Sequence, residues 1–319
     1  MDIGATTEKD RALPVHEIDW VLERLEWMRE RRIWPNGPRY LWTDAFGVVL
    51  LLSLHRETGE ERWLAEAERV VAEVERVLGR ERGIRIGEAA DRDGQYFHYL
   101  AMWLFALHRL GEEDPRYRER AVELVEEIHP AFVIPGRGVL WKMREDLSGP
   151  YSGYGFGALD PFHGLVVYRL LDSHALAHEI GEMEELVGET FKSLHLDQDL
   201  GLGMMLWMTH FFPAERWAVL QRVRSLNQLE RMWIDPPGYV CRHPRMRDTR
   251  FAFTNYGVSI GLQSVGEWPA RVRTIHDLFV TYRSGDEYDE AAITWVMACC
   301  ARLPGLLLRT DRGASPSRA

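Results

Sequence analysis

Cysteine is scarce in this chain, with 3 residues among 319. Cys241 stands alone, and Cys299 and Cys300 are adjacent within an apolar stretch, which is a poor framework for structural disulfides. We therefore expect all three to be core thiols. The N-terminus carries early acidic residues and lacks the apolar core of a signal peptide, and no later apolar run reaches membrane-spanning length without charges. These features predict a cytoplasmic protein.

Basic runs with interleaved aromatic residues are also missing. The chain has 39 Lys and Arg residues against 49 Asp and Glu residues, and its net charge is −10. This balance disfavours nucleic acid and anionic membranes as partners. It favours a small-molecule substrate, a sugar or another neutral or cationic ligand. The sequence leaves the oligomeric state open.

Motifs that bind metals, nucleotides or other cofactors are not found. The 12 histidines include no H-E-x-x-H pair and no Cys/His cluster with zinc spacing. No G-x-G-x-x-G motif or phosphate loop occurs, because GYGFG at 153–157 lacks a following Lys. We therefore expect neither a metal nor a cofactor.

The chain does contain a regular alternation of two kinds of helical segment. Residues 18–28 place their apolar side chains on one face, which indicates an outer amphipathic helix, whereas residues 42–55 are apolar nearly all round, which is typical of a buried inner helix. This outer–inner pair repeats six times. The even repeat predicts one all-α domain over residues 13–308, with disordered segments at 1–12 and 309–319.

A polar side chain stands at the expected start of each inner helix. The intervals between these residues average about 49 residues, which is the size of one helical hairpin with its loops. Six hairpins closed into a ring would bring the six polar groups to one mouth, where a ligand site would lie. The six residues are Asp44, Asp93, Asp160, Asp199, Asn255 and Asp289.

This alternation, together with the segment TGEERWLAEA after the first inner helix, resembles the (α/α)6 toroid superfamily of six helical hairpins. The resemblance covers residues 14–305. It implies a fold that is shared by glycoside hydrolases, polysaccharide lyases and sugar epimerases. Activity within such a superfamily depends on the residues of the site rather than on the fold.

Three of the polar residues stand beside aromatic side chains, which raise the pKa of a carboxyl group. They are Asp44, Asp93 and Asp160. Glycosyl transfer needs a protonated acid and a second carboxylate, so our first hypothesis is a glycoside hydrolase or related lyase. Each of the three can equally be a helix cap that accepts backbone N–H bonds. Asp199 and Asp289 are interpreted as caps alone.

Two histidines lie close to these carboxylates. Gln95 and His98 are three residues apart, so on a helix they share a face and point into the same cavity. His163 follows Asp160 by one helical turn. Our second hypothesis is an isomerase or epimerase in which His98 and His163 shuttle protons, as sugar epimerases of this fold class do. The alternative for each histidine is a hydrogen-bonded place in the core.

Two glycines near His163, Gly157 and Gly164, leave room for the close approach of a ligand. A further version of the second hypothesis is a terpene-cyclase-like enzyme that uses Asp91 and Asp93 as its acid. The full D-x-D-D pattern is absent, since Gly94 and Gln95 follow Asp93.

Substrate-binding groups are expected on inner helices and on two long loops, residues 130–158 and 235–251, which are rich in Gly, Pro and aromatic residues. Aromatic rings can stack on sugar faces, and amide and guanidinium groups can bind hydroxyls. A third hypothesis is a non-catalytic binding toroid, which predicts fully hydrogen-bonded caps and a filled axis. The candidate binding residues are Trp42, Gln95, Tyr96, Trp141, Tyr154, Asn255, Tyr256 and Arg242.

Overall fold

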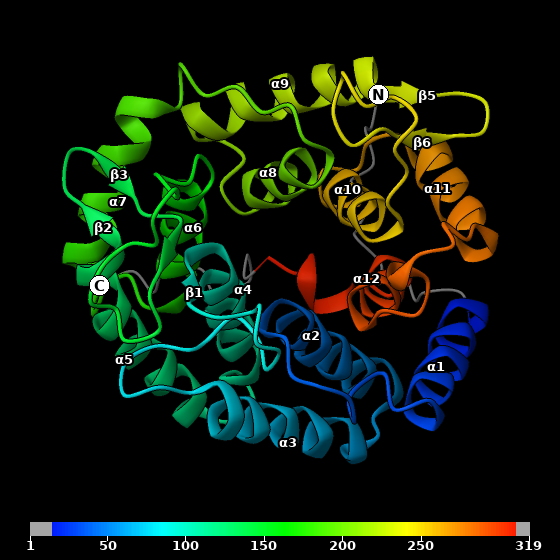
Figure 1. Ribbon diagram of the computed structural model, residues 1–319, viewed down its shortest axis with the longest axis horizontal. Coiled ribbons are helices and arrows are strands. Elements are labelled where there is room, and N and C mark those ends of the chain that lie inside the picture. The colour runs from blue at the N-terminus through cyan, green and yellow to red at the C-terminus, as the bar shows by residue number, and fades with distance from the viewer. Residues whose placement is uncertain (1–14, 311–319) are drawn as a thin grey trace, which may run out of the picture.

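The computed structural model describes residues 15–310, which form a ring of two concentric layers of helices (Figure 1). The fold is therefore the (α/α)6 toroid that the repeat predicts. The inner helices are α2 (Leu41–Thr58), α4 (Phe97–Leu110), α6 (Asp160–Leu171), α8 (Asp199–Phe211), α10 (Ala252–Ser264) and α12 (Ala292–Arg302). The outer helices are α1 (Val15–Glu30), α3 (Glu61–Leu78), α5 (Pro115–Phe132), α7 (Ala177–Thr190), α9 (Arg216–Met232) and α11 (Pro269–Thr281).

The two layers differ in how their side chains are buried. In α2, every residue from Leu41 to Leu54 is buried, because the helix packs against α3, α4 and α12. In α3, the buried residues recur along a single face and include Trp63, Val70 and Val74. The apolar stripe of an outer helix thus covers the inner ring, while its charged face meets solvent.

Each inner helix packs against its neighbours in the inner ring and, in the outer layer, mainly against the helix that follows it, and α12 packs against α1 to close the ring. The sequence analysis paired each outer helix with the next inner one, and this pairing is wrong. The reason lies in the connections: inner helices pass to the next outer helix through 2 to 5 residues, whereas outer helices pass to the next inner helix through 8 to 27 residues. All long connections consequently gather at the end of the ring where the inner helices begin.

Short two-stranded sheets shape three of the long connections. The strand β1 (Gln95–Tyr96) pairs with β4 (Lys142–Met143), and β2 (Val133–Ile134) pairs with β3 (Gly138–Val139). A third pair joins β5 (Trp233–Ile234) and β6 (Tyr239–Val240). Residues 93–96, expected in the fourth helix, therefore lie outside it.

The opposite end of the ring is covered by the last described segment, residues 303–310, which crosses the middle of the ring in Figure 1. It includes the 3-10 turn η2 (Gly305–Leu307). Inner helices hold its backbone: Trp207 Nε1 donates to the carbonyl of Leu307 at 2.8 Å, and the Leu306 amide donates to Ser53 Oγ at 3.0 Å. These contacts form a floor under the ring.

The two terminal segments expected from the sequence fall largely outside the described residues, which exclude all of 1–12 and most of 309–319. Arg309 is described, and its backbone carbonyl accepts a hydrogen bond from Arg109. Within residues 15–310, none of the helices is long and apolar enough to cross a membrane. The three cysteines are buried and unpaired, as expected.

Candidate active site

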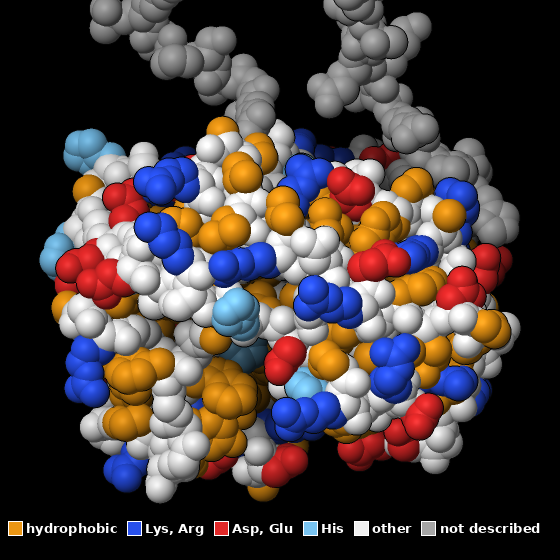
Figure 2. Space-filling view, turned by 90° about the horizontal axis from the view of Figure 1, so that it is seen from above, with side chains coloured by type: hydrophobic (Ala, Val, Ile, Leu, Met, Phe, Trp, Pro, Cys, Tyr) orange, Lys and Arg blue, Asp and Glu red, His pale blue; other side chains and the backbone are white. Residues whose placement is uncertain are grey.

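A cavity of about 420 Å³ lies at the end of the ring where the inner helices begin. Its size falls in the range that is typical of small-molecule sites. The surface of the molecule is also hollowed on the face in Figure 2, where hydrophobic and histidine side chains border the hollow. The lining residues of the cavity are Trp42, His98, Trp141, Phe156, Gly157, Ala158, Leu159, Asp160, His163, His195, Leu196, Asp197, Gln198, Leu200, Gly201, Met204, Met208 and Arg242.

Asp160 is the carboxyl group buried in this lining. It begins α6, but its side chain accepts no backbone N–H bond, and Oδ2 is buried without a hydrogen-bond partner among the described residues. The ionisable side chain next to it is His98, whose Nδ1 lies 3.9 Å from Asp160 Oδ1. Burial raises the pKa of Asp160 well above its ordinary value, because the ionised form loses its hydration, and this favours the protonated acid. The helix-cap interpretation is therefore wrong for Asp160.

Two imidazoles accompany Asp160 in the lining, as the sequence predicted. His98 stands in the first turn of α4, and His163 stands in the first turn of α6, where its Nε2 is buried without a partner. Burial lowers the pKa of each histidine to about 3. Both are neutral at physiological pH and able to accept a proton. The cavity thus combines a carboxyl group whose protonated form is favoured with two neutral imidazoles.

An aromatic stack holds His98 in place. Tyr96 stacks on the His98 ring at 5.5 Å and on Trp141 at 5.9 Å, and Trp42 meets His98 edge-on at 5.8 Å. Trp42 and Trp141 reach the cavity, whereas Tyr96 and Tyr154 pack behind Trp141. The two indole rings therefore offer flat apolar faces to a ligand.

Gly157 is required by the position of the Asp160 carboxyl group. A Cβ atom at position 157 would lie 1.7 Å from Asp160 Oδ2, so any other residue would displace the acid. At Gly164, a Cβ would lie 2.7 Å from Met183 Cε and 3.1 Å from Phe97 Cζ. The expectation that both glycines leave room for a ligand is thus wrong at Gly164, where the space is taken by packing between helices.

Asp44 does not line the cavity. It lies within the first turn of α2 and is fully buried, accepting hydrogen bonds from Trp34 Nε1 at 2.9 Å and from the Tyr40 amide at 3.1 Å. Arg39 lies 3.1 Å away as an ion-pair partner. Burial raises the pKa of Asp44 to about 6, and Arg39 and the Trp34 hydrogen bond oppose this rise. We correct its assignment from a catalytic to a structural carboxyl group.

Asp93 and Gln95 also lie outside the cavity lining. The Asp93 carboxylate pairs with Lys142 Nζ at 3.2 Å and accepts a hydrogen bond from the Tyr151 hydroxyl. The Tyr151 hydrogen bond and Lys142 together lower the pKa of Asp93. Gln95 sits in β1, before α4 begins, and its amide bonds to the backbone of Arg82, Ile84 and Glu145. Gln95 and His98 therefore share no helix face, and both Asp93 and Gln95 hold loops together.

Two candidate binding residues on α10 are likewise structural. Asn255 forms hydrogen bonds with both the amide and the carbonyl of Val240, which fixes β6 to α10. Tyr256 is completely buried against Phe279 and His276. Arg242, from the same long connection, does line the cavity.

Of the other carboxylates at expected helix starts, Asp199 begins α8 and accepts bonds from Thr254 Oγ1 and the Leu200 amide. Asp289 accepts bonds from the amides of Ser284 and Gly285. Both satisfy backbone or hydroxyl donors, but neither caps its inner helix, because the N-cap residues of α8 and α12 are Gln198 and Ala291, so the cap interpretation is wrong for both. Asp91 is exposed and pairs with Arg92, outside the cavity.

Sequence reasoning missed the connection between α7 and α8. Its residues 195–198 form one wall of the cavity, and Met204 and Met208 of α8 add apolar surface. The polar run HLDQD, which ends at the start of an inner helix, could have indicated this wall. The residues that line the cavity all lie in an inner helix or in the connection that precedes one. A metal site is not suggested by the described residues, which contain no group of three His, Cys, Asp or Glu placed to hold an ion.

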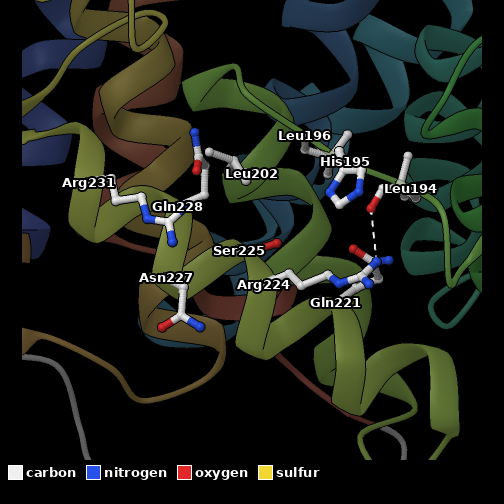
Figure 3. A pocket seen from close by; sticks show the side chains of 10 residues that line it. All are labelled: Leu194, His195, Leu196, Leu202, Gln221, Arg224, Ser225, Asn227, Gln228 and Arg231. Atoms are coloured by element: carbon white, nitrogen blue, oxygen red, sulfur yellow. Dashed lines mark hydrogen bonds between the residues drawn. The ribbon is translucent and has the colours of Figure 1, made fainter.

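A second, smaller cavity of about 230 Å³ lies on the other side of this wall (Figure 3). It shares His195 and Leu196 with the larger cavity and is otherwise lined mainly by α9. Arg224 of α9 donates to the carbonyls of Lys192 and Leu194 at 2.9 and 3.1 Å, which anchors the wall. The wall between the two cavities is therefore a loop tied to the outer layer.

Solved structures with the same fold cover most of this chain, although their sequences differ widely. A cellobiose 2-epimerase from Bacillus thermoamylovorans matches with a TM-score of 0.65 at 10% identity, over 90% of this chain and 98% of that one. A D-mannose isomerase matches with a TM-score of 0.66 at 8% identity, over 93% and 99%. An inactive variant of an α-1,6-mannanase from Salegentibacter, in complex with α-1,6-mannotriose, matches with a TM-score of 0.57 at 12% identity, over 92% and 100%. The sequence matches no protein-family model and no curated protein.

Proposed function

We propose that this (α/α)6 toroid is a sugar isomerase or epimerase that moves a proton on the carbon next to a carbonyl group. The observation that carries the proposal is the set of three groups that line the cavity: Asp160, whose buried Oδ2 has no hydrogen-bond partner and whose protonated form is favoured, and the two neutral imidazoles of His98 and His163. General acid–base chemistry needs a proton donor and a base in opposite states at the same pH, and this set supplies both.

The reaction can be written with these residues. His98 removes the proton from the carbon beside the carbonyl group, the electron pair forms the carbon–carbon double bond of an enediol, and Asp160 gives its proton to the carbonyl oxygen. His98 then carries a positive charge and Asp160 a negative one, 3.9 Å apart in the free enzyme. The site is neutral before and after this step, so no uncompensated charge is buried.

The intermediate collapses when a proton returns to carbon. If His98 passes the proton it has taken to His163, and His163 delivers it to the opposite face of the same carbon, the product is the epimer. If His98 instead delivers its proton to the neighbouring carbon, the product is the ketose. Asp160 takes back a proton from the enediol hydroxyl that becomes the carbonyl group, so all three side chains end as they began. Trp42 and Trp141 stack on the sugar ring and orient it.

Two of the similar structures support this choice, since they are named as a 2-epimerase and an isomerase of sugars. A glycoside hydrolase is the second candidate, because a protonated Asp160 beside two indoles suits a general acid. Its second carboxylate would be Asp197, which is exposed and bonded to His243 at 2.9 Å. The inactive mannanase variant carries two neighbouring Asp-to-Asn substitutions, whereas this chain has no two consecutive Asp residues.

The deciding experiment is incubation of the full chain with mannose, glucose and α-1,6-mannotriose in deuterium oxide, followed by proton NMR. We expect deuterium at C2 of the monosaccharides with formation of an epimer or ketose, and loss of both in His98→Gln. Release of monosaccharide from mannotriose without exchange at C2 would support the hydrolase instead. A cytoplasmic location stays a prediction.

A further inference from the structure

Arg242 stands out in the cavity lining because it forms no ion pair and donates no side-chain hydrogen bond to any of residues 15–310. The ring of Phe251 lies 5.2 Å from the guanidinium carbon and supports one of its faces. The residue is half-buried, and the N–H donors of a guanidinium form a fork that matches carboxylate or phosphate.

The backbone of Arg242 is fixed. Its amide donates to the carbonyl of Thr249 at 3.4 Å, and its carbonyl accepts from the amide of Asp199 at 3.3 Å, at the start of α8. Burial raises the pKa of the Asp199 carboxyl group to about 6, and the positive charge of Arg242 opposes this rise. The side chain is therefore mounted on a rigid junction rather than on a free loop tip.

The other titratable groups of the cavity do not balance this cation. Burial favours the protonated form of Asp160 and the neutral forms of His98 and His163. Asp197 is the remaining carboxylate in the lining, but its side chain is 62% exposed and is paired with His243. Inside the cavity, the permanent charge is thus the positive one of Arg242.

We propose that Arg242 binds an anionic group of the substrate, so that the sugar turned over is a sugar acid or a sugar phosphate. This inference rests on the proposed function, because it names the substrate class of the same site. It reverses the expectation of a neutral or cationic ligand, which followed from the net charge of the whole chain. The planar fork of Arg242 can pair with two oxygens of a carboxylate or a phosphate at once.

The test compares binding of glucuronate, glucose 6-phosphate and glucose by isothermal titration calorimetry. We expect the wild-type chain to bind one of the two anions at least tenfold more tightly than glucose, and the better anion identifies carboxylate or phosphate as the group. Arg242→Gln is expected to abolish this preference, and Arg242→Lys to retain part of it. Arg245→Gln, which removes an exposed charge from the same connection, is the matched control and should keep the preference.

Equal binding of anionic and neutral sugars by the wild-type chain would overturn the proposal, and so would a preference that survives in Arg242→Gln. Both results are read from binding and are independent of turnover. If neutral sugars exchange deuterium and no anion preference exists, the proposed function stands and the anion site fails. If the anion preference depends on Arg242 but no sugar exchanges, the anion site stands and the isomerase proposal fails.

Discussion

Two carboxyl groups at the same kind of position in the ring have opposite surroundings. Asp44 and Asp160 both lie in the first turn of an inner helix, and both are nearly inaccessible to solvent, at 0% and 2% exposure. Asp44 is surrounded by Trp34, Arg39 and the Tyr40 amide, whereas Asp160 has no hydrogen-bond partner for its buried oxygen. The degree of burial therefore does not distinguish the two carboxyl groups. The presence of hydrogen-bond and ion-pair partners at Asp44, and their absence at Asp160 Oδ2, does.

The difference arises in the connections that precede the two helices. The 10 residues before α2 fold back so that Trp34 and Arg39 reach the Asp44 carboxylate. The 27 residues before α6 end in a glycine-rich run and bring only Gly157 against the Asp160 carboxyl group. A satisfied carboxylate stabilises the fold, whereas an unsatisfied one in a cavity keeps its proton available for chemistry.

The largest expected effect comes from replacing the unpartnered acid. Asp160→Asn is expected to lower the rate of deuterium exchange at C2 about 1,000-fold, because the amide cannot give up a proton. Near pH 4, where Asp160 holds its proton in the folded chain, thermal stability should stay within about 1 kcal/mol of the wild type, since no hydrogen bond is lost. Exchange kinetics by NMR and thermal unfolding measure the two. A variant that keeps its rate would remove Asp160 from the mechanism.

The matching change at the satisfied acid should act on stability. Asp44→Asn leaves the buried Arg39 cation without its ion-pair partner, and we expect unfolding to become easier by about 3 kcal/mol. Urea unfolding followed by circular dichroism measures this difference. Replacing both partners, as Arg39→Met with Asp44→Leu, is expected to recover part of the loss, since no charge then remains buried. A stable single variant would contradict the assigned role.

A steric change can disturb Asp160 without altering its chemistry. Gly157→Ala places a methyl group where Oδ2 now lies, and we expect the exchange rate to fall about 10- to 100-fold as the carboxyl group is displaced. Gly155→Ala is the control in the same loop, because a Cβ there has no heavy atom within 4 Å. Equal rates for the two variants would show that the position of Asp160 is not critical.

The pH dependence of stability gives the smallest expected effect. An unfolded chain releases the Asp160 proton near pH 4, but the folded chain holds it to much higher pH, so this group stabilises the fold at low pH and loses its contribution as pH rises. The melting temperature of Asp160→Asn, relative to wild type, should therefore increase as pH rises above about 4. A difference that is flat across this range would mean that Asp160 ionises as in the unfolded chain.

The histidines shift stability in the opposite direction. The pKa of His163 is about 3 in the folded chain and about 6.5 in the unfolded chain, so its contribution is present above about pH 6.5 and is lost as pH falls toward 3. His163→Gln should consequently lose less stability than wild type between pH 6.5 and 3. Thermal scans of both proteins over this interval provide the check.

Sequence periodicity was sufficient to predict the ring, because the 3.6-residue pattern of outer helices and the all-round apolarity of inner ones are local properties. The same pattern also brought His98, Asp160 and His163 to attention as polar groups in apolar helices. It could not separate Asp44 or Gln95 from them, since their partners come from Arg39 and from loop backbone that the periodicity does not place. The wall at 195–198 was missed for the same reason.

The floor formed by residues 303–310 governs how molecules travel through the ring. Because Trp207 and Ser53 hold that segment across the end opposite the cavity, the ring is a cup rather than a tunnel. We therefore expect a ligand and its product to use the same mouth, one after the other. Under this geometry a product competes with the next substrate for entry, so inhibition by product is expected to be competitive.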